Sequence, residues 1–156
     1  MGKETERKFL VRGDFMPHAA SSSHIVQGYI ARSESLTLRV RTRGERGYIT
    51  IKGATDASGM TRAEWEYQIP VADARELLTY SRGVIDKVRY LVPVGRHTFE
   101  VDRFAGENEG LVVAEVELAS ADEEFERPDW LGEEVTGDRR YYNSQLLKQP
   151  YSELRR

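Results

Sequence analysis

The chain has 156 residues, no cysteine and a formal net charge of −3, with 31% charged and 39% hydrophobic residues. This length predicts one domain over residues 1–156 with a core of its own. The mixed charge argues against a nucleic-acid or membrane partner, and the lack of cysteine excludes disulfides and thiolate metal sites. No apolar run approaches the ~20 residues that span a bilayer, and no apolar leader follows the first residues, so we expect a cytoplasmic protein.

Alternating apolar and charged residues predict strands in the first half of the chain. The predicted strands cover residues 3–11, 25–31, 36–42, 48–52 and 61–69. In the third of them Arg39, Arg41 and Arg43 share one face, opposite aliphatic residues. The glycine-bounded turn at 44–47 predicts a hairpin from the third strand to the fourth.

After Pro70, the spacing of Val71, Ala74, Leu77 and Leu78 predicts a helix over residues 71–80. Further strands are predicted at 84–92, 97–104 and 111–118, with short helices at 120–125 and within 138–147. About eight strands joined by short turns predict an α+β fold with an antiparallel sheet. The chain lacks the regular strand–helix alternation of a parallel sheet.

Each predicted strand has one aliphatic and one charged face, and the sign of the charge is segregated between strands. The basic faces carry Arg39, Arg41, Arg43, Lys52, Lys87 and Arg89. The acidic faces carry Glu4, Glu6, Glu64, Glu66, Glu100, Asp102, Glu115 and Glu117. A charged strand face is most often a solvated outer surface, and for any single strand this is the simpler interpretation. Repeated acidic pairs are more than a surface needs, because clustered carboxylates repel one another.

A closed barrel of about eight strands would bring these charged faces into its lumen. Carboxylate oxygens are the ligands that Mg²⁺ and Mn²⁺ prefer, and arginine is the preferred fork for phosphate oxygens. A ligand that suits both walls is a chain of phosphates with a bound divalent cation.

The charged residues also form an ordered set of motifs that covers nearly the whole chain. These are Glu4-x-Glu6-x-Lys8, Gln27-Gly28-Tyr29, Leu38-Arg39-Val40-Arg41, Thr50-Ile51-Lys52, Arg62-x-Glu64-x-Glu66, Lys87-x-Arg89, Glu100-x-Asp102-x-Phe104, Glu115-x-Glu117 and the run from Glu134 to Tyr141. The set resembles the CYTH superfamily, or triphosphate tunnel metalloenzymes, in its bacterial inorganic-triphosphatase-like branch. The resemblance implies a closed eight-stranded antiparallel β-barrel, or tunnel, with a few helices packed outside.

The resemblance further implies a Mg²⁺- or Mn²⁺-dependent hydrolase that removes the terminal phosphate of inorganic triphosphate. The implied metal ligands are Glu4, Glu6, Asp102, Glu115 and Glu117. The implied phosphate-binding residues are Lys8, Arg39, Arg41, Lys52, Arg62, Arg89 and Arg140. Lys87 and Tyr29 match a Lys–Tyr pair near the active centre, and either this pair or a carboxylate would orient the attacking water.

Several alternatives stay open at this point. Glu64, Glu66 and Glu100 fit a role as ion-pair partners of the basic residues, and Glu64 and Glu66 also fit the placement of water or a second metal. The same tunnel would suit a nucleoside or thiamine triphosphatase, an adenylate cyclase, or a non-catalytic polyphosphate-binding module. A structural domain without a ligand is the third class. A homodimer formed through the outer surface is compatible with each of them.

Overall fold

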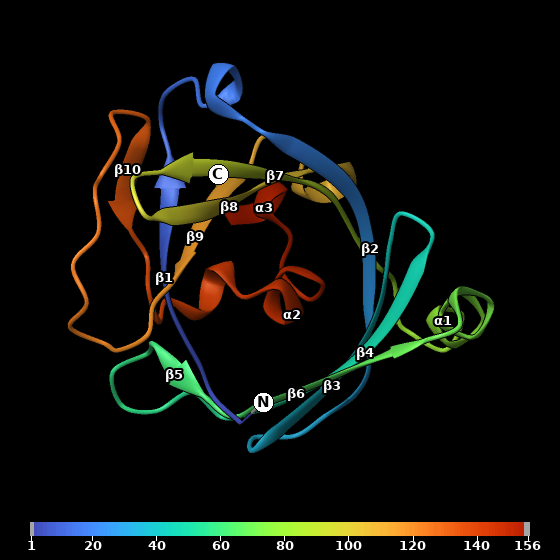
Figure 1. The fold of residues 1–156 in the computed structure, drawn as a ribbon. Coiled ribbons are helices and arrows are strands. Elements are labelled where there is room, and N and C mark those ends of the chain that lie inside the picture. The colour runs from blue at the N-terminus through green and yellow to red at the C-terminus, as the bar shows by residue number, and fades with distance from the viewer. Residues whose placement is uncertain (1, 155–156) are drawn as a thin grey trace.

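The computed structural model describes residues 2–154, and most of their regular structure is antiparallel sheet. The strands are β1 (Glu4–Val11), β2 (Ser21–Arg32), β3 (Leu36–Arg43), β4 (Arg46–Gly53), β5 (Thr61–Arg62), β6 (Glu64–Ile69), β7 (Ile85–Val94), β8 (His97–Phe104), β9 (Val112–Glu117) and β10 (Leu131–Glu134). The helices are α1 (Val71–Leu78), α2 (Asn143–Leu146) and α3 (Tyr151–Leu154), with 3-10 turns η1 (Met16–His18), η2 (Gly106–Asn108) and η3 (Arg139–Tyr141). Figure 1 shows the strands arranged around a central space that contains α2. No helix in the described part of the chain is long and apolar enough to cross a membrane.

The sheet runs in the order β10-β1-β9-β8-β7-β2-β3-β4-β6, and β5 pairs separately with β1. The expected eight-stranded closed barrel is corrected on both counts. Residues 2–154 form ten strands, because the segment predicted at 61–69 is interrupted at Ala63 and β10 was not expected. The ladder also ends at β6 and β10 without joining them. Local contacts bridge part of this gap: β5 pairs with β1, and Gly2 and Glu64 exchange backbone hydrogen bonds of 3.1 and 3.3 Å.

Two short turns are made by glycines with left-handed backbone angles. The predicted hairpin is confirmed, with Arg43 opposite Arg46 across β3 and β4 and Gly44 at a φ of 59°. Gly95, at a φ of 61°, turns β7 into β8. At these angles an L-residue with a Cβ is strained, whereas glycine is not. Because these turns are short, the strands that they join pair in register, and side chains paired across the two strands lie on the same face of the sheet.

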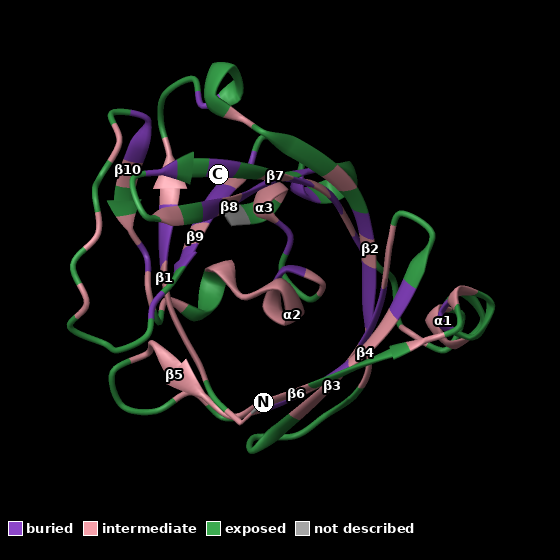
Figure 2. Ribbon diagram, in the orientation of Figure 1, coloured by how far each residue is buried: buried purple, intermediate pink, exposed green. Residues whose placement is uncertain are grey.

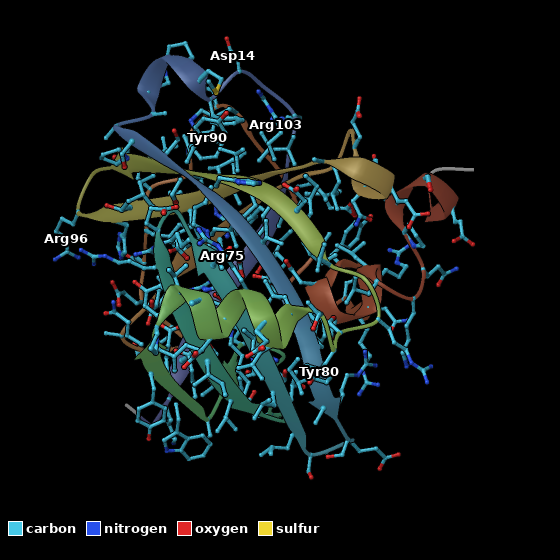
Figure 3. All side chains as sticks on the ribbon, turned by 90° about the vertical axis from the view of Figure 1, so that its right-hand side faces the viewer. Asp14, Arg75, Tyr80, Tyr90, Arg96 and Arg103 are labelled. Atoms are coloured by element: carbon cyan, nitrogen blue, oxygen red, sulfur yellow. The ribbon has the colours of Figure 1, made fainter. Side chains whose placement is uncertain are left out.

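The helix predicted at 71–80 is confirmed as α1 and packs on the outer face of β3 and β4. Figure 3 shows it across that face, with the labelled Arg75 carried on it. A Cβ added to Gly47 would lie 2.7 Å from the Cβ of Ala74, so the missing side chain permits this close approach. The helix expected at 120–125 is absent. There the Glu123 carboxylate accepts a hydrogen bond from the backbone N–H of Ala119 and pairs with His97, which holds the segment in an irregular loop.

The larger core lies on the outer faces of β1, β7, β8 and β9, beneath the irregular segments that cover them. Its buried members are Phe9, Phe15, Val92, Val94, Phe99, Val101, Ala114, Val116, Leu118, Trp130 and Leu131. The aliphatic faces of these strands therefore point away from the central space, as their alternation predicts. Figure 2 shows the buried residues on these strands.

A second core closes one end of the central space. It is built from Ile85, Phe104, Leu111, Val113 and Leu146, with Leu10, Tyr141, Leu147 and Tyr151 packed against it. Leu146 belongs to α2, so the expectation that the helices pack outside is corrected for α2, whereas α1 does pack outside. The strand residues of this core lie on the same strand faces as the charged residues of the cavity. Leu10 follows Lys8 by two positions, and Val113 precedes Glu115 by two. Each inward face thus changes from charged to apolar at the same end.

Candidate active site

The charged faces of the strands line one cavity of about 250 Å³. All of the residues predicted for the site line it except Asp102 and Arg140. Those that do are Glu4, Glu6, Lys8, Tyr29, Arg39, Arg41, Lys52, Arg62, Lys87, Arg89, Glu115 and Glu117. Side chains alternate between the two faces of each strand, and these residues lie on the inward face. The order of the strands places β1, β9 and β8, which carry the acidic residues, side by side.

The acidic wall is made by direct cross-strand neighbours. Glu6 lies opposite Glu117 in the register of β1 and β9, and Lys8 lies opposite Glu115. Burial, together with the nearby Glu115 and Glu4, raises the pKa of Glu6 well above its ordinary value. Burial also opposes ionisation of Glu115, but Lys8 and a hydrogen bond to Glu6 outweigh it and hold the pKa of Glu115 well below the ordinary value. The wall therefore favours a neutral Glu6 beside an ionised Glu115 while no cation is bound there.

This wall fits a divalent cation by its chemistry. Within residues 2–154 no three acidic or histidine side chains already stand around a common point. Glu4, Glu6, Glu115 and Glu117 nevertheless offer carboxylate oxygens alone, which is the donor set of a hard cation. Their mutual repulsion, expressed in the raised pKa of Glu6, is relieved when a cation binds among them.

The opposite wall concentrates buried guanidinium groups. Burial, followed by the neighbouring Arg39 and Arg89, lowers the pKa of Arg41 to about 10. Glu66 lies 3.3 Å from Arg41 and 3.8 Å from Arg39, and it is shared between the two. The Nε atoms of Arg39 and Arg41 are buried and have no hydrogen-bond partner within residues 2–154. Both arginines line the cavity, and guanidinium groups gathered on one wall suit a polyanion.

The remaining carboxylates are ion-paired with the basic residues. Lys52 Nζ lies 3.0 Å from Glu4 and 3.3 Å from Glu64, and Arg89 Nη1 lies 3.3 Å from Glu100. Together with the contact of Glu66 to the two arginines, these distances favour the ion-pair interpretation of Glu64, Glu66 and Glu100.

Asp102 lies behind the cavity wall and holds two cations in place. Arg89 donates hydrogen bonds of 2.8 and 2.9 Å to its two oxygens, and Lys87 Nζ lies 2.8 Å from one of them. Burial opposes ionisation of Asp102, but Arg89 and Lys87 outweigh it and lower its pKa to about 2. Because both oxygens are engaged and do not line the cavity, the structure differs here from the implied metal set.

Arg140 is also placed away from the cavity. Its guanidinium lies 2.6 Å from Asp138, and 61% of its side chain is exposed. Although the resemblance implies a phosphate-binding role for Arg140, the residue does not line the cavity.

Lys87 and Tyr29 both line the cavity, and two amide side chains connect them. Lys87 Nζ donates to Asn143 Oδ1 at 2.8 Å, and Gln27 Nε2 donates both to that oxygen at 3.1 Å and to the Tyr29 hydroxyl at 3.2 Å. Burial lowers the pKa of Lys87 to about 8, although Asp102 acts to raise it.

Sequence reasoning assigned no role to several residues that line the cavity. Arg43 continues the phase of Arg39 and Arg41, so the alternation itself was a sufficient signal. Thr136, Tyr142 and Asn143 come from the irregular C-terminal region. Thr136 lies within the matched run from Glu134 to Tyr141 but was given no role, and no local pattern marks Tyr142 and Asn143. Lys8 reaches this region, because its Nζ donates to the Tyr141 carbonyl at 3.3 Å and lies 5.3 Å from the Tyr142 ring centre.

A mostly antiparallel sheet wrapped around a cavity with opposed acidic and basic walls defines a class of tunnel-like phosphate-binding proteins. The family model described as the CYTH domain matches residues 2–145, and the chain belongs to this family. It is 47% identical to an inorganic triphosphatase of Acetivibrio thermocellus over 99% of both chains. It is 38% identical to an inorganic triphosphatase of Nitrosomonas europaea, over 92% of this chain and 95% of the relative.

Solved structures agree with this membership. A crystal structure described as an inorganic triphosphatase matches with a TM-score of 0.67 and 35% identity, covering 92% of this chain and 93% of that one. A conserved hypothetical protein from Pyrococcus furiosus matches with a TM-score of 0.62 and 22% identity, covering 76% of this chain and 80% of that one. The second match supports the fold alone.

Proposed function

We propose that this protein is a divalent-metal-dependent triphosphatase that removes the terminal phosphate of inorganic triphosphate. The observation that carries the proposal is that the guanidinium-bearing Arg39 and Arg41 line one cavity together with the carboxylates of Glu4, Glu6, Glu115 and Glu117. Two near full-length relatives named inorganic triphosphatase support the same activity.

The size of the cavity supports a substrate without a base. Its volume of about 250 Å³ lies below the ~300–1,000 Å³ of sites that hold drug-sized ligands. Charged side chains line most of it, so each phosphate meets a donor or a bound cation. Nucleoside or thiamine triphosphate, adenylate cyclisation and passive polyphosphate binding remain the alternatives that the experiment below separates.

The roles follow from the two walls. Arg39, Arg41, Arg89 and Lys52 of the basic wall would bind phosphate oxygens. Lys8 on β1 and Arg62 on β5, which pairs with β1, would add donors from the side of the acidic wall. Lys87 and Tyr29 would donate to the phosphoryl group that is transferred, where developing charge needs fixed donors. A carboxylate of the acidic wall would hold the attacking water.

Glu4, Glu6, Glu115 and Glu117 would hold Mg²⁺ or Mn²⁺. When bound there, the cation supplies positive charge to the phosphate oxygens. A cytoplasmic location is part of the same proposal.

The test is release of phosphate from tripolyphosphate, pyrophosphate, ATP and thiamine triphosphate, with Mg²⁺, with Mn²⁺ and with EDTA. We expect metal-dependent turnover that is fastest on tripolyphosphate and falls by roughly a hundredfold or more in Glu6→Gln. Glu133→Gln, on the exposed side of β10, is the matched control. Faster turnover of ATP or thiamine triphosphate would replace the substrate. A lack of turnover, with tripolyphosphate still raising the Tm, would replace the enzyme with a binding module.

A further inference from the structure

A continuous row of hydrogen bonds joins the two side chains proposed to donate to the transferred phosphoryl group. It runs from Lys87 on β7, through Asn143 on α2 and Gln27 on β2, to Tyr29 on β2. Gln27 is fully buried and Lys87 is 2% exposed. Figure 1 shows α2 inside the ring of strands, in a position to connect β7 with β2.

The polarity of this row follows from Lys87. An ammonium group has donors and no acceptor, so Asn143 must turn its oxygen toward it. The same oxygen faces Gln27, which must then present its amide nitrogen. The second N–H of Gln27 points to the Tyr29 oxygen. Because that oxygen accepts, the hydroxyl proton of Tyr29 stays available for another acceptor.

The geometry at Lys87 leaves one direction open. Its tetrahedral Nζ donates to Asp102 and to Asn143, each at 2.8 Å, and the carbon chain takes a third position. Within residues 2–154 Nζ has no third side-chain acceptor, although it lies 5.5 Å from the centre of the Phe104 ring, and Lys87 lines the cavity, where the remaining N–H can meet a ligand. Tyr29 lines the same cavity, so both free donors belong to groups facing one space.

The row also leaves one polar atom without a partner. Gln27 Oε1 is buried and makes no hydrogen bond within residues 2–154. Leaving a buried acceptor unpaired is destabilising, so a fold selected for stability alone would not favour this arrangement. Strain of this kind is expected where a group must be held in a set orientation.

We propose that Asn143 and Gln27 are positioning residues that aim the remaining donor of Lys87 and the hydroxyl proton of Tyr29 at a phosphoryl oxygen in the cavity. This inference rests on the proposed function. Donors that are fixed before the reaction need no reorganisation as charge develops, so the row acts on turnover more than on substrate binding.

The first test compares Asn143→Ala and Asn143→Asp, using kcat and KM for tripolyphosphate with saturating metal. We expect Asn143→Ala to lower kcat by ~10–100-fold with little change in KM, which is the usual effect of removing a group that orients a reacting one. Asn143→Asp keeps an oxygen toward Lys87 and should recover part of kcat. Gln145→Ala, in the same helix but not lining the cavity, is the matched control for disturbance of α2.

The second test asks whether Asn143 acts through Lys87. In a Lys87→Met background, Asn143→Ala should cause little further loss of kcat, because the group that it orients is already gone. The corresponding cycle joins Gln27→Met with Tyr29→Phe and gives an independent answer if Asn143→Ala fails to fold. Losses that multiply in these cycles would overturn the proposal, as would an unchanged kcat in Asn143→Ala.

The two proposals fail in different ways. If the wild-type protein does not hydrolyse any of the four substrates, the proposed function fails and this inference fails with it. If the wild type is active and Asn143→Ala and Gln27→Met are equally active, only the positioning role fails.

Discussion

Arg89 and Asp102 stand directly opposite each other in the register of β7 and β8, and the guanidinium donates two hydrogen bonds of 2.8 and 2.9 Å to the carboxylate. Lys87 Nζ lies 2.8 Å from the same carboxylate. One buried anion therefore serves two buried cations. Arg89 also lies 3.3 Å from Glu100 and 3.6 Å from Glu115, so Asp102 holds the two cations in fixed positions within a wider set of ion pairs.

Asp102→Ala should destabilise the protein strongly. It leaves Lys87 and Arg89 buried without their shared anion, and removal of one member of a buried pair typically costs about 3–5 kcal/mol. Urea unfolding followed by circular dichroism measures the change. Asp86→Ala breaks a surface pair with His24, in which both side chains are about half exposed, and should cost about 0–1 kcal/mol. Equal losses in the two variants would contradict the buried role of Asp102.

Arg41→Met should separate stability from ligand binding. Burial and neighbouring cations oppose the charge of Arg41 in the folded protein, as its lowered pKa of about 10 indicates. Its replacement by an apolar side chain should raise the unfolding free energy of the ligand-free protein by about 1 kcal/mol. It should also reduce the rise in Tm that tripolyphosphate causes in the wild type. Arg75→Met, at an exposed pair with Glu45, should leave both quantities unchanged.

Glu6→Gln should separate stability from metal binding on the acidic wall. Because burial, together with the nearby Glu115 and Glu4, opposes ionisation of Glu6, its neutral amide counterpart should be more stable than the wild type in EDTA, by about 1 kcal/mol. Added Mn²⁺ should raise the Tm of the wild type and have a much smaller effect on the variant. A metal-induced rise in Tm of equal size in both proteins would remove Glu6 from the proposed metal ligands.

The pH profile of kcat/KM should show the deprotonation of Lys87. Burial lowers its pKa to about 8, with Asp102 and Glu115 acting to raise it and Arg89 to lower it further. As pH rises through about 8, the ammonium loses a proton and with it a donor to phosphate, so kcat/KM should fall on that limb. Lys87→Arg keeps its charge throughout this range and should move the limb to higher pH. A limb at the same pH in both proteins would assign it to another group.

The strand faces were readable from the sequence because a period of two is a local property of an extended chain. Arg39 and Arg41 point inward for the same reason that Val40, between them, is fully buried on the other face. The helix after Pro70 was likewise visible from its apolar spacing. The interruption at Ala63 and the strand at 131–134 were missed, because short segments carry too few residues to show a period.

What the sequence determined by itself is the set of inward charges and their segregation by sign, since both follow from alternation along single strands. Only the tertiary structure decided which of these charges reach the cavity. Asp102 lies on the same face of β8 as Glu100, yet Arg89 and Lys87 cover it. Asn143 carries no local signal, yet it meets Lys87 across 56 residues of chain. Such contacts depend on how distant segments pack, and the apolar end of the tunnel places α2 among the strands.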